Sequence, residues 1–343
     1  MKTKVETLCY PIIFKPIYKE MIWGGDRLAS MFGRNLPTDF GKTRKIGESW
    51  DISCRPNEMS IIENGPFAGS TFAEYIAKDR VRILGTRLAN CERFPLLVKI
   101  IDANDTLSIQ VHPDDNFARQ KDASDCGKCE MWYILHPPDS GHLIIGLKPG
   151  ITQKKLAEAY ENGTVEDCLN HLPVAAGDVI DIPAGLVHAL TKGTIVAEIQ
   201  QNSDITYRLY DFNRPGLDGN LRPLHVEDAL AVSDFEERIP KRTVSAESNS
   251  NKNNENELIP LIHNSHFATV KYVLSNSVTE KSNPSTFFIF TCVDGDAIVT
   301  TGEFSVELCK GKSVFIPAGT GTYSIAPING KAILLKSFVP EIS

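Results

Sequence analysis

The feature that most constrains the fold is a succession of short, strand-like apolar segments separated by Gly, Pro and Asp. Four clear examples are Phe94–Ile101, Gly141–Gly146, Thr194–Gln200 and Thr286–Cys292. Many short strands with turn residues between them are typical of β-sandwiches and jelly rolls. The sequence therefore predicts a mainly β protein.

Few stretches have helical periodicity. They are residues 71–78, 152–162, 226–233 and a segment that begins near Thr164. In the second of these, Thr152 is a plausible N-cap and Leu156 shares a face with Ala159 and Tyr160. We expect the helices within about residues 150–172 to form a small insertion between strands.

Two segments, residues 177–188 and 311–322, repeat one phrase: a Gly turn, an apolar strand, then Ile-Pro-Ala-Gly. Pro ends ladder pairing and Gly permits a tight turn, so the residue three after this Gly is predicted to re-enter the sheet. That residue is His188 in the first copy and Thr322 in the second. The repeat favours a duplicated β-unit, of which one copy is catalytic and the other structural, although it could also be a common strand–turn phrase.

The expected domain boundaries follow from composition. Residues 246–257 are rich in Asn and Ser and have no large apolar side chain, so they cannot bury a face. We predict a catalytic domain over residues 1–240 that includes the helical insertion, a polar linker or loop over 241–257, and a smaller β-domain over 258–343.

Charge and composition narrow the possible partners. The chain has 343 residues and a net charge of −7, which argues against nucleic acid or an anionic membrane as the main partner. No apolar run approaches the length of about 20 residues that a membrane span needs. The N-terminus lacks the pattern of a signal peptide, so the cytoplasm is the expected location. A small anionic substrate remains possible because it needs only a local basic cluster.

A candidate metal site begins in Leu107–Asp115. Residues two apart on a strand face the same way, so Gln110 and His112 are predicted to share one face while Ile109 and Val111 pack on the other. Glu130 and His188 follow in strand or strand-end contexts. An amide oxygen, two imidazoles and a carboxylate together suit zinc or another divalent transition metal. Taken singly, each His could be a hydrogen-bonded core residue, and Glu130 could simply pair with Lys128.

Longer phrases carry a family resemblance. Gly-Asp-x-x-x-Ile-Pro-Ala-Gly-x-x-His is the phrase that cupins use for a late metal-ligand strand, and the chain resembles the short bacterial forms of type I mannose-6-phosphate isomerases. The matching phrases run in family order over roughly residues 10–235. They are Trp23–Gly25, Ile46–Trp50, Phe94–Asp102, Leu107–Asp114, Lys128–Trp132, Ile182–His188 and Gln200–Asp211.

The resemblance implies a cupin-type jelly-roll catalytic module followed by a second, metal-less β-module. It also implies one Zn²⁺ per chain, held by the family's ligands, which fall on Gln110, His112, Glu130 and His188. The implied reaction is the interconversion of mannose 6-phosphate and fructose 6-phosphate through an enediol or enediolate.

The resemblance also implies roles for two cations. The family's active-site lysine falls on Lys128 and its essential arginine on Arg208. The planar guanidinium of Arg208 suits a phosphate or a developing enediolate, or it could pair structurally with Asp204 or Asp211. Ser108, two residues before Gln110, is a further candidate for binding phosphate.

The general base is left open between Glu198, Asp211 and His225, with Glu198 as the preferred candidate. Glu48 and Trp50 are expected to support the site or the fold. The predicted partner is a phosphorylated hexose, and the expected state is a monomer or a weak homo-oligomer.

Two other functions compete. A cupin oxygenase would favour a His-rich ligand set suited to iron, against which Gln110 and the basic residues Lys128 and Arg208 argue. A non-catalytic sugar-binding or regulatory cupin is the second. Such a protein should have lost ligands in its first module, yet all four are present.

Overall fold

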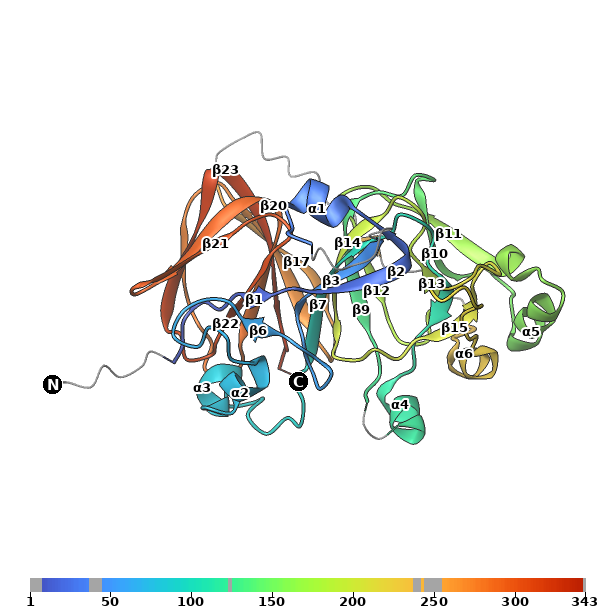
Figure 1. Ribbon diagram of the computed structural model, residues 1–343, viewed down its shortest axis with the longest axis horizontal. Coiled ribbons are helices and arrows are strands. Elements are labelled where there is room, and N and C mark those ends of the chain that lie inside the picture. Colours follow the sequence, from blue (N-terminus) through green and yellow to red (C-terminus); the bar gives the residue numbers. More distant parts are fainter. Residues whose placement is uncertain (1–7, 37–44, 123–124, 237–241, 244–254, 342–343) are drawn as a thin grey trace. The chain divides into compact units, whose positions relative to one another are not determined.

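Two compact β-units make up the described chain, which comprises residues 8–36, 45–122, 125–236, 242–243 and 255–341 of a computed structural model (Figure 1). We call residues 18–49 and 99–245 the central unit. Residues 1–17, 50–98 and 246–343 form the terminal unit. The mainly β fold predicted from the sequence is confirmed.

The central unit contains two sheets. The seven-stranded sheet has the order β16-β12-β9-β14-β7-β3-β2 and the five-stranded sheet the order β11-β10-β13-β8-β15. Their strands are β2 (Ile17–Gly25), β3 (Ile46–Ile52), β7 (Leu96–Asp102), β8 (Ile109–Val111), β9 (Glu130–His136), β10 (His142–Leu147), β11 (Leu169–Pro173), β12 (Val179–Ile182), β13 (His188–Ala189), β14 (Ile195–Gln201), β15 (Tyr207–Tyr210) and β16 (Arg242–Thr243). The helices are α1 (Arg27–Phe32), α4 (Asp115–Lys121), α5 (Gln153–Glu161), the 3₁₀ turn η1 (Val165–Cys168) and α6 (Val226–Val232).

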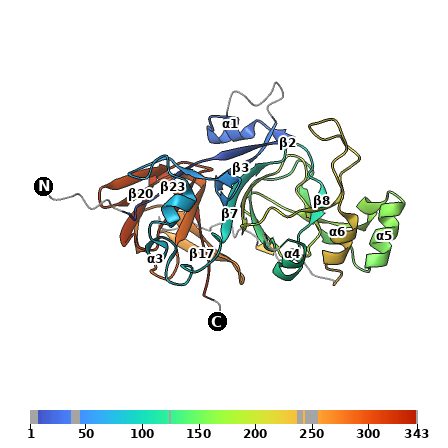
Figure 2. The ribbon, with the colours of Figure 1, turned by 60° about the horizontal axis from the view of Figure 1, so that its bottom comes forward.

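The five-stranded sheet buries side chains on both faces. One face contributes Leu143 and Ile145 to a core shared with Trp132 and Ile134 of β9. The other face packs under the helices, and Leu156 of α5 lies in this second core. The two helices α5 and α6 lie side by side over it (Figure 2). This arrangement confirms the predicted sandwich, with α5 and η1 within the predicted helical insertion.

The predicted caps and turns take the expected form. The side chain of Thr152 accepts a hydrogen bond from the Lys155 amide at 3.3 Å and so begins α5. The segment after Thr164 is a 3₁₀ turn rather than an α-helix, because only the four residues Val165–Cys168 lie between Thr164 and the start of β11. His188 and Thr322 each begin a strand, as the repeated Ile-Pro-Ala-Gly phrase predicts.

The terminal unit is built on one large sheet of order β17-β18-β23-β20-β21, to which β19 and β22 add by pairing with β23 and β20. Its strands are β1 (Phe14–Lys15), β4 (Cys54–Arg55), β5 (Glu58–Met59), β6 (Ile61–Ile62), β17 (Glu257–His263), β18 (Ala268–Leu274), β19 (Val278–Lys281), β20 (Phe288–Thr301), β21 (Phe304–Leu308), β22 (Ser313–Ile316) and β23 (Thr322–Phe338). Two short helices, α2 (Phe72–Ile76) and α3 (Arg80–Leu84), complete it.

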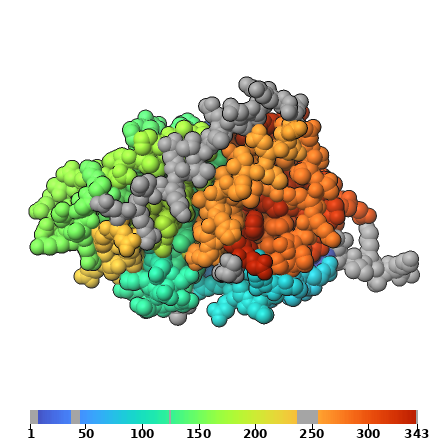
Figure 3. All heavy atoms as spheres, turned by 180° about the vertical axis from the view of Figure 1, so that it is seen from behind, coloured from blue at the N-terminus to red at the C-terminus, as the bar shows by residue number. Residues whose placement is uncertain are grey.

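The compact units divide the chain differently from the predicted domains. Residues 50–98 belong with the C-terminal strands, and Figure 3 shows this cyan segment against the orange and red surface. The Ala318 amide donates to the Ile83 carbonyl at 3.1 Å and the Thr86 amide to the Pro284 carbonyl at 2.9 Å. Such contacts join segments about 200 residues apart, which strand periodicity does not reveal. Most of the predicted linker, residues 241 and 244–254, lies outside the described residues, and the functional domain boundaries remain a prediction.

Candidate active site and metal centre

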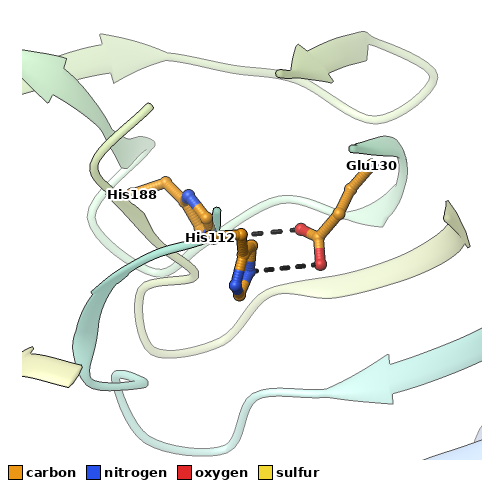
Figure 4. A group of neighbouring side chains, drawn as sticks. All are labelled: His112, Glu130 and His188. Atoms are coloured by element: carbon orange, nitrogen blue, oxygen red, sulfur yellow. Dashed lines mark ion pairs between the residues drawn. The ribbon is translucent and has the colours of Figure 1, made fainter. Parts of the chain in front are cut away.

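Three buried side chains converge inside the central unit (Figure 4). His112, Glu130 and His188 each offer one ligand atom, and these atoms lie within 4.8 Å of one another. The His112 Nε2 atom is 3.4 Å from Glu130 Oε1, and the His188 Nε2 atom is 3.8 Å from Glu130 Oε2. Two imidazoles and a carboxylate at such separations form a set that suits a divalent metal.

Strand register brings the fourth predicted ligand to the same place. In the five-stranded sheet, His188 of β13 is paired directly with Gln110 of β8. The Gln110 Nε2 and His188 Nε2 atoms are 3.4 Å apart. A rotation of about 180° exchanges the oxygen and nitrogen of a side-chain amide without changing its shape. This rotation presents the Gln110 Oε1 atom to the cluster. The structure thus brings together all four residues predicted as ligands.

Backbone carbonyls orient both imidazoles. The Nδ1 atom of His112 lies 2.8 Å from the Ile205 carbonyl oxygen, and that of His188 lies 2.7 Å from the Leu186 carbonyl oxygen. With Nδ1–H donated there, each Nε2 lone pair faces the cluster. Burial, then the Lys128 ammonium, lowers the pKa of His112 to about 3, and burial also lowers the pKa of His188. Both rings are therefore neutral, which is the form that binds metal.

Glu130 is a buried carboxylate whose two oxygens accept no hydrogen bond from the described residues. Burial favours its neutral form, but the Lys128 ammonium holds its pKa well below the ordinary range. The Lys128 Nζ atom lies 2.7 Å from Glu130 Oε1 and 3.3 Å from His112 Nε2. An ionised carboxylate without hydrogen bonds, beside two neutral imidazoles, fits a bound cation.

A cavity of about 270 Å³ opens beside this cluster. Five of the predicted site residues outside the His–Glu–His cluster line it: Ser108, Gln110, Lys128, Glu198 and Arg208. Its apolar wall includes Trp23 and Trp132. A small cavity with several converging charges suits a compact, anionic, polar ligand.

Glu198 lies in a buried charged group at one side of this cavity. The Trp132 indole N–H donates to Glu198 Oε2 at 2.8 Å, and the Lys99 Nζ atom lies 3.3 Å from Oε1. Burial, then the charge of Glu130, raises the pKa of Glu198. The Lys99 ammonium also lies 3.5 Å from Glu48 Oε2. Although burial opposes it, the Glu48 and Glu198 carboxylates raise the pKa of Lys99.

The sequence reasoning assigned no role to Lys99. The signal that could have identified it is a lysine inside the apolar run Leu96–Ile101, in a strand whose seven residues are all buried. A buried lysine requires an anionic partner, so a partner such as Glu198 could have been sought. Glu48, which is expected to support the site or the fold, pairs with this lysine.

Arg208 of β15 is paired with Gln110 of β8 and is therefore next to one of the candidate ligands. Its Nη1 atom donates to the Pro223 carbonyl at 2.8 Å, whereas its buried Nε atom has no hydrogen-bond partner among the described residues. Ser108 Oγ donates to Gln110 Oε1 at 3.5 Å, the limit of a hydrogen bond. Both residues are thus part of the cavity wall.

The two alternative bases have other partners. Asp211 accepts hydrogen bonds from Arg214 and Arg222. The Nδ1 atom of His225 accepts the Arg208 amide at 3.2 Å. Neither Asp211 nor His225 is among the described residues that line the cavity, so Glu198 remains the best placed of the three.

Comparisons with known proteins agree with this geometry. Residues 12–128 match the family profile "Phosphomannose isomerase type I, catalytic domain", and residues 259–339 match "Mannose-6-phosphate isomerase, cupin domain". The probable mannose-6-phosphate isomerase GmuF of Bacillus subtilis is 34% identical over 93% of this chain and 96% of its own.

Solved structures give the same result. The mannose 6-phosphate isomerase of Bacillus subtilis has a TM-score of 0.80 and 28% identity, with 95% of this chain and 99% of that chain covered. A mannose 6-phosphate isomerase bound with zinc and yttrium shares the fold, with a TM-score of 0.71 and 18% identity over 96% of this chain and 100% of that one.

Proposed function

The chain belongs to the type I mannose-6-phosphate isomerase family, and from this premise we propose that it interconverts mannose 6-phosphate and fructose 6-phosphate. The observation that carries the proposal is the convergence of His112, Glu130 and His188 beside a charged cavity of about 270 Å³. The neutral rings and the buried carboxylate fit a metal, and the basic residues fit a phosphorylated sugar.

We propose one Zn²⁺ per chain, held by Gln110, His112, Glu130 and His188. Two imidazoles, one carboxylate and an amide oxygen are borderline and hard donors that zinc accepts. When bound, such an ion polarises the carbonyl and the adjacent hydroxyl oxygen of the substrate.

The residues of the cavity account for the rest of the reaction. Isomerisation removes a proton from the carbon beside the carbonyl and returns one to the neighbouring carbon, while the hydroxyl proton moves between the two oxygens. We propose that Glu198 Oε1 takes and returns the carbon proton, because it is buried, lines the cavity and accepts no hydrogen bond from the described residues. A raised pKa brings a carboxylate closer to working pH, where it both accepts and donates a proton efficiently.

The cations have separate proposed roles. Lys128 lies beside Glu130 and on the cavity wall, from which its ammonium can stabilise negative charge on the substrate oxygens. Arg208 and Ser108 are proposed to bind the substrate, with the guanidinium facing the phosphate or the enediolate.

The alternative of a non-catalytic sugar-binding or regulatory cupin has less support. All four predicted ligands are brought together in the central unit, whereas the repeated phrase of the terminal unit places Thr322 at the position of His188. Among the described residues, no helix is long and apolar enough to cross a membrane. A cytoplasmic location and a monomeric or weakly associated state remain predictions.

The test couples conversion of mannose 6-phosphate to detection of fructose 6-phosphate, before and after chelation and after zinc is restored. The expected result is activity that chelation removes and zinc restores, with about one equivalent of metal by elemental analysis. His188→Ala should abolish metal binding and turnover, while Thr322→Ala at the equivalent position should change neither. A metal-loaded protein that forms no fructose 6-phosphate would contradict the proposed function.

A further inference from the structure

A carboxylate that the proposed mechanism does not use holds two arginines next to the cavity. Asp211 directly follows β15 and is 5% exposed. It accepts from Arg222 Nε at 2.7 Å and from Arg222 Nη2 at 2.6 Å, a side-on bidentate pair. It also accepts from Arg214 Nε at 3.1 Å and Nη2 at 3.0 Å.

Only one of these two arginines reaches the cavity. Arg222 lines it together with Arg208, whereas Arg214 is not among the described lining residues and extends to Asp105 at 3.4 Å. The bidentate pair engages the Nε and Nη2 atoms of Arg222 and leaves Nη1 outside the pair. A planar guanidinium can bind a carboxylate by one edge and a second anion by another.

The local charge balance favours an anion at this place. Three guanidinium groups, those of Arg208, Arg214 and Arg222, influence one another around Asp211. Asp211 and the more exposed Asp105 pair with Arg214 and Arg222. Among the described residues that line the cavity, four are cations and three are carboxylates: Lys99, Lys128, Arg208 and Arg222 against Glu48, Glu198 and Asp204. Burial, then the charge of Arg222, lowers the pKa of Arg208, so the group is stabilised when a further negative charge enters the cavity.

The loop that carries Arg222 needs this anchor. Phe212 and Asn213, directly after Asp211, have φ values of 56° and 51°. The left-handed region is unfavourable for a bulky residue such as phenylalanine, so surrounding contacts must hold it there. The Arg214 guanidinium lies 5.4 Å from the Phe212 ring centroid, and the Gly216 amide donates to the Asn220 carbonyl at 2.6 Å. Figure 2 shows the loop between β15 and α6 as a projecting hairpin.

We propose that Asp211 is a positioning residue that presents Arg222 to the cavity as a second guanidinium for the phosphate dianion of the substrate. This inference rests on the proposed isomerase function. Arg208 remains free to act nearer the reacting carbons, since it is paired in register with Gln110. The two arginines thus divide the binding of the phosphate from the stabilisation of charge at the reaction centre.

The experiment compares Arg222→Ala with the matched control Arg214→Ala. Each variant removes one of the two arginines that pair with Asp211, but only the first removes a guanidinium from the cavity wall. Inorganic phosphate is the probe, and its inhibition constant is measured with the KM for mannose 6-phosphate. We expect Arg222→Ala to raise both by about tenfold or more, corresponding to about 1.4 kcal/mol, with kcat changed much less. Arg214→Ala should leave the inhibition constant within about twofold.

Asp211→Asn should also raise the inhibition constant for phosphate. Asp211→Glu, which keeps the carboxylate, should raise this constant less than Asp211→Asn does. A purely structural role for Asp211 would instead lower the melting temperature and leave phosphate inhibition unchanged. If Arg222→Ala binds phosphate like the wild type, or if Arg214→Ala weakens it equally, the inference is wrong. Phosphate binding by calorimetry tests Arg222 even in a protein without isomerase activity, so the inference and the proposed function fail separately.

Discussion

Glu198 and Lys336 occupy the same register position in the two β-units. In the repeated phrase, Ile182 is paired with Glu130 and Ile316 with Phe288. Two residues further along, Trp132 is paired with Glu198 and Phe290 with Lys336. The indole N–H of Trp132 donates to Glu198. The Lys336 Nζ atom instead lies over two phenyl rings, 3.9 Å from the Phe288 centroid and 5.6 Å from the Phe290 centroid.

The sign of each charge follows from its aromatic neighbours. An indole N–H is a hydrogen-bond donor and stabilises an anion, while a phenyl face attracts a cation. Lys336 then requires an anion, and Glu280 accepts from its Nζ at 2.7 Å and from the Tyr323 hydroxyl at 2.6 Å. The terminal unit thus keeps a charged interior position but fills it with an internal ion pair.

Glu280→Gln should destabilise the protein by about 1–3 kcal/mol at pH 7, because it removes a charged acceptor shared by buried donors. Burial raises the pKa of Glu280, but hydrogen bonds from Lys336, Tyr272 and Tyr323 lower it below the ordinary value overall. A depressed folded pKa contributes stability that is present above the unfolded pKa of about 4.3 and is lost as the pH falls through the folded value.

The measurement is urea unfolding of the wild type and Glu280→Gln at pH 7 and near pH 3. The difference in unfolding free energy should shrink at the lower pH. Glu307→Gln, on the exposed face of β21, serves as the control and should change stability little at either pH. Equal destabilisation at both pH values would show that the effect does not come from the carboxylate charge.

Metal removal should destabilise the central unit without unfolding the protein. Three of the four proposed ligands, Gln110, Glu130 and His188, lie on strands, and His112 directly follows β8. Backbone pairing and apolar cores hold the register of these strands, so we expect the fold not to depend on the ion. A ligand at 100 times its dissociation constant adds about 2.7 kcal/mol to folding stability. Melting curves with chelator and with added zinc should differ for the wild type but coincide for Glu130→Gln. A chelated protein that loses its far-ultraviolet β signal would contradict this expectation.

The sequence predicted where the candidate ligands lie because part of their placement depends on local rules, and the family resemblance implied the rest. Alternation along Leu107–Asp115 placed Gln110 and His112 on one face, and the Pro-Ala-Gly turn returned His188 to the sheet. The contacts that it missed are long-range. Lys99 meets Glu198 only because β7 and β14 are neighbours in the sheet, and residues 50–98 join the C-terminal strands through pairings about 200 residues apart. Period and spacing carry no information on which distant strands become neighbours.

Arg208→Lys should damage turnover far more than stability. The substitution keeps the charge but loses the planar fork, so it tests geometry. Losing a group that stabilises transition-state charge costs on the order of 10²–10³ in rate. Kinetics and thermal melts on one preparation decide the matter. Near-normal turnover in a protein with a lowered melting temperature would assign Arg208 a structural role through its bond to the Pro223 carbonyl.

Glu198→Gln should abolish proton transfer at carbon while leaving metal content intact. Gln keeps the size of the side chain and can still accept from the Trp132 indole, but it cannot act as a base. General-base catalysis typically contributes 10²–10⁴-fold in rate, so kcat should fall by about that factor. In D₂O the wild type should incorporate deuterium at carbon 2 of mannose 6-phosphate, and the variant should incorporate far less.

The matched control is Glu48→Gln, because Glu48 also pairs with Lys99 and lines the cavity. If Glu48→Gln loses exchange to the same extent, the role of Glu198 is to balance the charge of Lys99, and the base must be sought elsewhere in the cavity.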